Sequence, residues 1–377
     1  IVRFDDTVNL SSGSIDDLKF NTSGNVILNS DLTGNVTLTA NNQGTITTTG
    51  SIQTIIGNIG TSASNDLGTL NIGSSTDSTN YSSTTIAGNV FANSTVLNNN
   101  GSTNSSTLTL TNGSNITSNI TTADSNMGIL TLEGSSIVTG TVGTTAERLN
   151  QINSGANTSS STFTGDIYAV NISNTGTGTT IFQNDVTATN INVNAGTTTF
   201  QDNLTATTTT ISTGTGNFNT VSGSTNSNIV FNNTGTANLY GDLTGNVTTT
   251  ADNQGTLTVI GSTSGKNQTI NGNIGTSSSL DLNTLNIGET GVSSNYTVTT
   301  INGNIYANNT VLNNGTTASS ELILSSGNNI TSTITTADDG RGILTLVGGT
   351  QTVTGTVGTS GAKLANVNAG ANGATST

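Results

Sequence analysis

The feature that most constrains this chain is an interval, because similar apolar side chains recur every 18 or 19 residues. Phe163, Phe182, Phe200 and Phe218 lie 19, 18 and 18 residues apart, and Thr alternates with Val, Ile or Ala between them. Such alternation of β-favouring residues indicates short, half-buried strands. Coils stacked about 4.8 Å apart place residues of one interval directly above one another. The sequence therefore predicts an all-β fold, a parallel β-solenoid with about 18–20 residues per coil.

Within a coil, the inward-facing parity changes once. Val186 and Ala188 share one parity, and Ile191 and Val193 share the other, so the buried face changes phase at Asn190. A one-residue slip turns every later side chain to the opposite face. This slip predicts a corner between two strands at Asn190, and the chain length predicts roughly 20 coils of this kind.

A much longer repeat surrounds this segment. Residues 20–157 are copied by residues 231–372, residues 158–230 link the two copies, and phrases such as DLTGNVT occur in both. Self-similarity on this scale is typical of repeat architectures, in which each unit packs on its neighbours. We therefore expect one continuous β-solenoid over residues 1–377.

The composition argues against a large rounded core. Hydrophobic residues make up 30% of the chain, aromatic residues 3% and charged residues 7%, which is below the shares of an ordinary globular domain. Intrinsic disorder is the alternative interpretation, but disordered chains are rich in Pro and charge, and this chain contains no Pro. The composition favours an elongated β architecture with a thin apolar core and with Asn, Gly and Ser at the corners.

Charge and missing residue types narrow the function classes. The formal net charge is −14 and the six Lys and Arg residues are scattered, so a nucleic-acid partner is not expected. The chain contains no Cys and no His, which removes thiol and imidazole chemistry, disulfides and the usual zinc ligands. No apolar run reaches the roughly 18 residues of a membrane span. We expect neither a membrane span nor a cofactor in this chain.

Adjacent carboxylates are the first candidates for catalysis. The pairs are Asp5-Asp6, Asp16-Asp17 and Asp338-Asp339. Because neighbours in a strand point to opposite faces, a pair of this kind is more simply a turn with solvated carboxylates than an acid-base couple. We expect no catalytic residue among them.

Asp166, Asp185 and Asp202 recur at nearly the coil interval and form a candidate metal ladder. A column of carboxylates could hold calcium, yet the Gly- and Asp-rich nonapeptide of calcium-binding β-rolls is absent. The alternative is a row of like charges relieved by the Asn residues between them. We expect no metal site.

The five tyrosines are candidates for a sugar-binding stripe, since aromatic rings stack on sugar faces. Tyr81, Tyr168, Tyr240, Tyr296 and Tyr306 fall at inconsistent positions within the coils, so packing or scattered exposure is the expected role. Glycine phrases such as GNIG and GTVG resemble fragments of phosphate-binding loops, but no GxxxxGK precedes a helical pattern. We interpret these glycines as corners.

Both ends of the sequence fall inside coil phrases. Thr377 aligns at an offset of 215 with Thr162, immediately before Phe163, and RFDDTVNL opens with a coil phrase already under way. A solenoid needs capped ends to block edge pairing, and neither terminus carries an amphipathic cap. We expect the chain to be part of a longer repetitive protein.

Three phrases resemble a known family. TADDGRGILTLVGG, TVTGTVGTSGAKLANVNAGA and STFTGDIYAVNI resemble the passenger regions of bacterial type V autotransporters, in particular the rickettsial surface cell antigens of the outer membrane protein A and B type. The likeness spans most of the chain and implies a right-handed parallel β-helix. No receptor-binding motif of that family is identifiable here, so no binding residue carries over.

The resemblance implies a secreted passenger attached to the outer surface of a Gram-negative cell. Its expected function is that of a non-catalytic rod that acts as an adhesin for host-cell or matrix surfaces and as a surface-layer component, with the segment from Ser74 to Ser83 as a contact loop. The alternative is a structural subunit that self-associates in a surface layer, sheath or extracellular filament. A polysaccharide-active enzyme is the minor alternative, and it would require a groove with convergent carboxylates.

Overall fold

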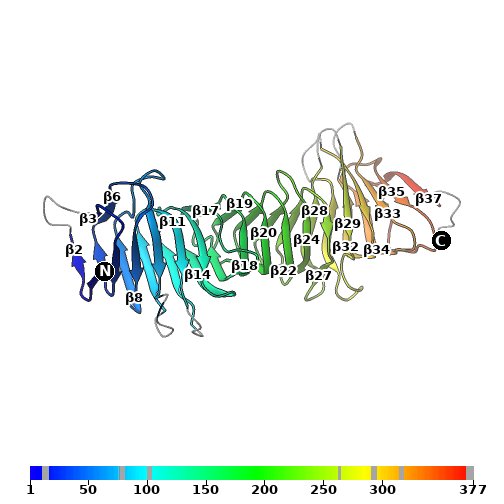
Figure 1. The fold of residues 1–377 in the computed structure, drawn as a ribbon. Helices are drawn as coiled ribbons and strands as arrows, with labels where there is room; N and C mark the ends of the chain where they lie inside the picture. Colours follow the sequence, from blue (N-terminus) through cyan, green and yellow to red (C-terminus); the bar gives the residue numbers. More distant parts are fainter. Residues whose placement is uncertain are drawn as a thin grey trace. The chain divides into compact units, whose positions relative to one another are not determined.

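The computed structural model describes residues 1–10, 17–74, 76, 81–99, 104–261, 265–289, 295–313 and 318–370, and it has strands but no helix within these ranges. The chain divides into unit 1, Ile1–Ile191, and unit 2, Asn192–Thr377. Each unit is built from short parallel strands, as Figure 1 shows. The structure is a β-solenoid of about 16 coils of roughly 22 residues, which confirms the predicted fold class.

The strands of unit 1 are β1 (Val2–Phe4), β2 (Val8–Asn9), β3 (Asp17–Phe20), β4 (Asn25–Leu28), β5 (Leu32–Thr33), β6 (Asn35–Leu38), β7 (Gln43–Thr48), β8 (Ile52–Ile56), β9 (Leu67–Ile72), β10 (Ser83–Ala87), β11 (Val90–Leu97), β12 (Thr107–Leu110), β13 (Ile116–Thr122), β14 (Met127–Leu132), β15 (Ser136–Thr139), β16 (Leu149–Ser154), β17 (Ser160–Phe163), β18 (Ile167–Asn174) and β19 (Thr179–Phe182), and β20 (Val186–Val193) spans the boundary between the units.

The strands of unit 2 are β21 (Thr197–Phe200), β22 (Leu204–Ile211), β23 (Thr215–Phe218), β24 (Thr225–Phe231), β25 (Thr236–Leu239), β26 (Leu243–Thr244), β27 (Val247–Thr249), β28 (Gln254–Val259), β29 (Lys266–Asn271), β30 (Leu282–Ile287), β31 (Thr297–Ile301), β32 (Ile305–Leu312), β33 (Glu321–Leu324), β34 (Ile330–Thr336), β35 (Arg341–Leu346), β36 (Val353–Thr354) and β37 (Leu364–Ala369).

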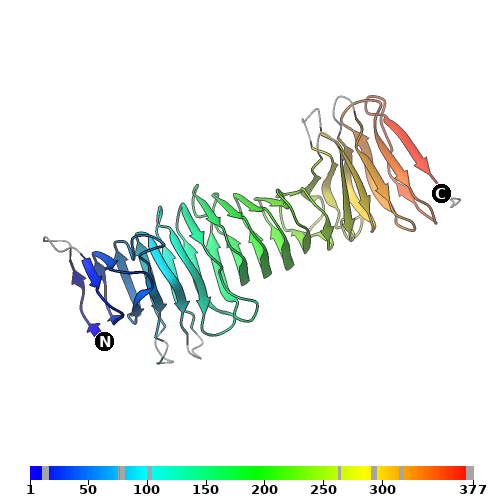
Figure 2. The ribbon, with the colours of Figure 1, turned by 45° about the horizontal axis from the view of Figure 1, so that its top comes forward.

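Every strand pairs in parallel with the equivalent strand of the next coil. In unit 1 one stack runs β1, β4, β7, β9, β11, β13, β15, β17, β19. A second stack runs β2, β5, β8, β10, β12, β14, β16, β18. Unit 2 repeats the arrangement, for example from β28 through β30 and β32 to β34. Figure 2 presents the same succession of strands from a turned view.

The coil length varies more than the sequence predicts. Paired residues are 18 positions apart at Thr197 and Thr215, but 31 positions apart at Thr54 and Thr85. The predicted average of 18–20 residues per coil is therefore too short, and the predicted number of roughly 20 coils is too high. The physical reason is that the strand ladder fixes only which residues stack, whereas corners facing solvent can lengthen at little cost.

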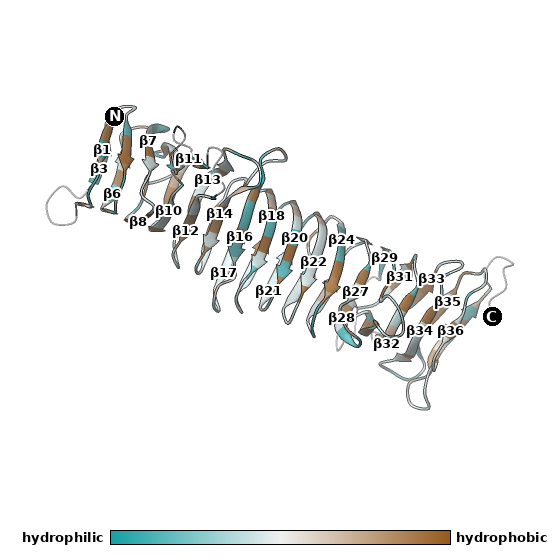
Figure 3. Cartoon of the chain, turned by 90° about the horizontal axis from the view of Figure 1, so that it is seen from below, coloured by the Kyte–Doolittle hydropathy of each residue, from teal (hydrophilic) through white to brown (hydrophobic). Residues whose placement is uncertain are grey.

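Side chains that share the interval stack inside each unit. The rings of Phe163 and Phe182 lie 5.0 Å apart in unit 1, and those of Phe200 and Phe218 lie 5.5 Å apart in unit 2. All four are fully buried at the ends of strands in which buried and half-buried residues alternate. Apolar and polar segments follow one another along the strands in Figure 3. The predicted apolar column is thus confirmed within each unit.

The phase slip predicted at Asn190 is present, but it is not a corner. Asn190 is exposed between buried Ala188 and Ile191, and all three belong to the single strand β20. In unit 2 the corresponding slip in β22 is a shift of register between Thr205 and Thr208. A bulge of this kind changes the buried face while the strand continues. The prediction of a strand-to-strand corner is therefore wrong.

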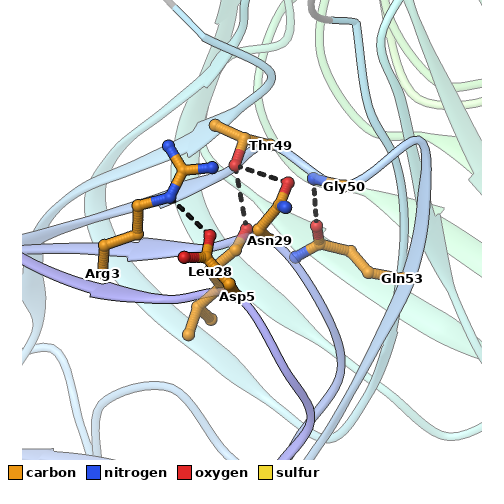
Figure 4. A network of polar contacts seen from close by, with 7 residues as sticks. All are labelled: Arg3, Asp5, Leu28, Asn29, Thr49, Gly50 and Gln53. Atoms are coloured by element: carbon orange, nitrogen blue, oxygen red, sulfur yellow. Dashed lines mark hydrogen bonds and ion pairs between the residues drawn. The ribbon is translucent and has the colours of Figure 1, made fainter.

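Side chains also tie consecutive coils together at the corners. In Figure 4 the Thr49 hydroxyl donates to the backbone oxygen of Leu28 (3.4 Å) and approaches Oδ1 of Asn29 (3.2 Å), both one coil away. The Gly50 N–H donates to Oε1 of the buried Gln53 (2.7 Å), which closes the turn before β8. The Thr49 hydroxyl and the Gly50 N–H are thus paired outside the strand ladders.

Candidate functional site

The acidic pairs do not form a common site. Asp5 lies 2.5 Å from Nε of Arg3, and both side chains are exposed. Asp339 accepts a hydrogen bond from the Lys363 backbone N–H (2.8 Å), and this bond lowers the pKa of its carboxyl. Asp16 lies outside the described residues. These carboxylates serve separate turns and ion pairs.

The candidate metal ladder is divided between the units. In unit 1 the Asp185 backbone oxygen accepts the Ile167 N–H (2.9 Å), which places Asp185 one coil beyond Asp166. In unit 2 the Ser222 hydroxyl donates to Oδ1 of Asp202 (3.2 Å). Within the described ranges, no three acidic side chains come together as a metal site.

Two of the tyrosines share a position that the sequence interpretation missed. Tyr168 and Tyr306 each follow an Ile that forms a parallel β-bridge with the preceding coil. Each tyrosine also packs against a glycine of that coil whose backbone is left-handed. Phe91, which is not a tyrosine, occupies the same local position beside Gly60. The expectation of inconsistent positions is therefore wrong for Tyr168 and Tyr306.

Asparagine side chains form a ladder next to Phe91. The N–H of Asn58 donates to Oδ1 of Asn35 (2.9 Å), the N–H of Asn89 to Oδ1 of Asn58 (2.8 Å), and the N–H of Asn115 to Oδ1 of Asn89 (3.0 Å). Each side-chain oxygen therefore holds the backbone of the next coil. Because a backbone N–H requires an oxygen acceptor, these bonds also fix which amide atom is which.

A glycine precedes three of the ladder asparagines, Asn35, Asn58 and Asn89, and it explains why the coils approach so closely there, whereas Ser114 precedes Asn115. Gly57 precedes Asn58 and has a φ of 140°, and a Cβ at Gly57 would lie 2.3 Å from the backbone oxygen of Gly34. Only glycine tolerates both this backbone conformation and this contact. In the dipeptide Gly-Asn, the glycine thus permits the close approach of the coils and the asparagine supplies the hydrogen bond between them.

The ladder lines a groove of about 320 Å³ on unit 1. We call it the asparagine groove, and its lining residues are Asn35, Thr37, Asn58, Gly60, Thr61, Asn89 and Phe91. Thr61 begins a small hairpin, in which its N–H donates to the Asn65 backbone oxygen (3.1 Å). The groove therefore has an amide row, two threonines and one aromatic ring, and none of its lining residues is charged.

Unit 2 repeats these residues at offsets of 211 or 215. The seven positions are Asn246, Thr248, Asn273, Gly275, Thr276, Asn304 and Tyr306, so six are identical and Phe91 is replaced by another aromatic residue. The hydrogen bonds repeat as well, since the N–H of Asn273 donates to Oδ1 of Asn246 and that of Asn304 to Oδ1 of Asn273, both at 2.8 Å. We call this set the copy site.

Sequence reasoning missed the groove although its signal was present. The phrases GNV and GNI were interpreted only as corners, because a single sequence does not tell which corner side chains stack. Phe91 was not considered with Tyr306, although 306 − 91 = 215 is the offset of the long repeat. Comparing aromatic residues across the two copies would have found the pair.

Half of the predicted contact loop from Ser74 to Ser83 lies outside the described residues. Of its described members, Tyr81 is 40% exposed, whereas Ser82 is buried and its hydroxyl lies 3.0 Å from that of Thr84. These residues lead into β10.

Comparisons of this chain with protein-family models, with curated proteins and with solved structures give no match.

In the portion of the chain that the structure describes, no helix has the length and apolar character needed to cross a membrane.

Proposed function

We propose that this chain is the non-catalytic rod of an autotransporter passenger, displayed on the outer surface of a Gram-negative cell, where it acts as an adhesin and surface-layer component. The observation that carries the proposal is the duplication of the asparagine groove residues on a β-solenoid. A stacked scaffold can repeat one surface many times. Amide, hydroxyl and aromatic groups suit binding, whereas they include no acid-base pair for catalysis.

The solenoid fold itself is compatible with display at a cell surface. Its strands are held by ladders between coils, so the outward side chains are free to vary or to repeat without loss of the core. The resemblance of TADDGRGILTLVGG and related phrases to autotransporter passengers supplies the cellular setting of the proposal.

Binding to cells tests this function directly. Fluorescent beads carrying the purified chain should adhere to cultured host cells or to extracellular matrix, and free chain should compete for the attachment. Beads that attach no better than albumin-coated beads at every coating density would refute the adhesive function.

Lateral packing in a surface layer is a second candidate, favoured by two outward isoleucines on β8. Ile52 is 82% exposed and Ile56 is 52% exposed. Contiguous exposed apolar surface marks interaction sites, and these two side chains lie on the same face of β8. Sedimentation at rising protein concentration should then show association that Ile52→Ser with Ile56→Ser removes.

A further inference from the structure

We propose that the asparagine groove and the copy site each bind an uncharged glycan, so that one chain carries two equivalent sites. The proposal rests on the adhesive function and names its ligand class.

The amide groups of the groove are donors held in fixed positions. Oδ1 of Asn58 and Oδ1 of Asn89 each accept a backbone N–H from the next coil. Their Nδ2 groups therefore point away from that bond, and the structure gives them no acceptor among the residues it describes. In the copy site the same holds for Nδ2 of Asn273 and Asn304. Donors that are already oriented lose little entropy when they bind a ligand oxygen.

The aromatic residue supplies an apolar surface beside this donor row. Phe91 and Tyr306 are both half-buried, and each backbone packs against a buried glycine, Gly60 or Gly275. A sugar ring offers C–H groups on its face and hydroxyl oxygens at its edge, which match an aromatic face and a row of N–H donors.

The absence of charge within the groove excludes other ligand classes. All seven lining residues are neutral, so a phosphate, sulfate or carboxylate would find no cation to pair with. A volume of about 320 Å³ lies at the lower end of small-ligand pockets, whereas a folded protein partner needs a much larger contact area. An uncharged oligosaccharide fits both the chemistry and the size.

The two units can be compared for which outward residues recur and which differ. Ile52 and Ile56 lie on the coil that carries Asn58, yet their counterparts at the offset of 215 are Asn267 and Asn271. The groove positions change only from Phe91 to Tyr306. Outward positions outside the groove thus include some that differ between the copies, such as Ile52 and Ile56, and some that recur, such as the exposed Ser64 and Ser279, while those within the groove retain their chemistry.

Tyr168 provides an internal control. It packs against Gly143 as Phe91 packs against Gly60, but the residues before the bridged positions of its coils are Thr141 and Asp166 instead of asparagines. It therefore offers an aromatic ring without the amide row, and we expect it not to bind.

The test is a panel of immobilised uncharged oligosaccharides of glucose, galactose, mannose and N-acetylglucosamine, with sialylated and sulfated oligosaccharides as the charged set. The full chain should bind members of the uncharged set, and titration calorimetry with the best of them should give two sites per chain. Phe91→Leu or Tyr306→Leu should each leave one site, and the double variant none. Tyr168→Leu should leave two.

Leucine keeps apolar bulk against the glycine but removes the ring face, and circular dichroism with thermal unfolding verifies that each variant is folded. Binding of charged glycans only, of no glycan, or unchanged binding by the folded double variant would overturn the proposal. Cell attachment by the double variant equal to that of the parent would overturn the glycan as the ligand of adhesion while the adhesive function stands. Glycan binding by a chain that attaches to no cell would refute the adhesive function and leave the two glycan sites standing.

Discussion

Thr310 and Ser332 lie one above the other inside unit 2, with their hydroxyl oxygens 2.8 Å apart. Both are buried, and the same contact recurs between Thr95 and Ser118 in unit 1 at 2.9 Å. Stacking places equivalent hydroxyls of consecutive coils within hydrogen-bond distance, so each satisfies the other. This pairing explains how a chain with 30% hydrophobic residues fills its interior.

Removing one member of such a pair should cost more than removing both. Ser332→Ala leaves the Thr310 hydroxyl buried without its partner, and we expect a loss of about 1–3 kcal/mol in the free energy of unfolding. Adding Thr310→Val should recover most of that loss, because no polar group is then left unpaired. Urea unfolding of the parent, both single variants and the double variant measures the coupling, and purely additive losses would contradict the pairing.

Glycines with left-handed backbones lie in the related turn phrases TADNQG, which ends at Gly255, and TADDGRG, which contains Gly340. Gly255 has a φ of 71°, and a Cβ built there would lie 2.1 Å from the Phe231 ring of the preceding coil. Gly340, with a φ of 75°, has no atom within 4 Å of its Cβ position. A side chain at position 255 would therefore meet both an unfavourable backbone conformation and a clash, whereas one at position 340 would meet the unfavourable backbone alone.

We expect Gly340→Ala to cost about 1–2 kcal/mol from the left-handed backbone, and Gly255→Ala to cost about 1–3 kcal/mol more because Phe231 must move. Thermal and urea unfolding of both variants measure the difference. Equal losses would mean that the close packing of Gly255 on Phe231 does not limit this turn.

At the scale of elements, one turn differs in charge between the two units. In unit 2 the Asn253 N–H donates to Oδ1 of Asp281 (3.0 Å), and Asp252 lies beside it. Burial raises the pKa of Asp281, and the neighbouring Asp252 raises it further against the effect of the Asn253 hydrogen bond. In unit 1 the equivalent of Asp252 is Asn41, whose Oδ1 accepts the Asp66 N–H (3.3 Å).

An acid whose pKa is raised on folding stabilises the fold fully below its unfolded pKa, near 3.8 here, and this stability is lost as the pH rises through the raised value. Asp252→Asn removes one cause of the rise. The variant should therefore have a higher thermal midpoint than the parent at pH 7, and the two should converge near pH 3. Asn41→Asp is the matched control, and it should lower the midpoint at pH 7. A gain for Asp252→Asn that is equal at both pH values would contradict this assignment.

Elements were only partly predictable from the sequence. The alternation around Phe163 and Phe182 predicted strands and an apolar column, because burial on one face leaves a period of two. The slip at Asn190 was visible, but a bulge and a corner have the same parity signature. The asparagine groove requires Asn58 and Asn89 to be neighbours although they are 31 residues apart. A constant interval of 18 or 19 residues does not pair these two asparagines.

At the scale of the whole molecule, the long repeat predicted a repeat architecture, while neither the duplicated groove residues nor the coil length was predicted. Within unit 1 Thr85 stacks on Thr54, and the 31-residue coil between them includes the small hairpin that begins at Thr61. Corner excursions of this kind raise the average coil to roughly 22 residues. The strand ladder sets the register, and the register decides which residues stack.

Cross-linking tests that register most directly, because the chain has no cysteine of its own. Stacked residues lie about 4.8 Å apart, within the Cα separation that a disulfide spans. Thr54→Cys with Thr85→Cys should form a disulfide in the folded chain under glutathione exchange, and mass spectrometry should identify the linked peptides. Asp66→Cys with Thr85→Cys, 19 residues apart as a constant coil would require, should stay reduced. A disulfide in the second pair and none in the first would contradict the stacking described for this protein.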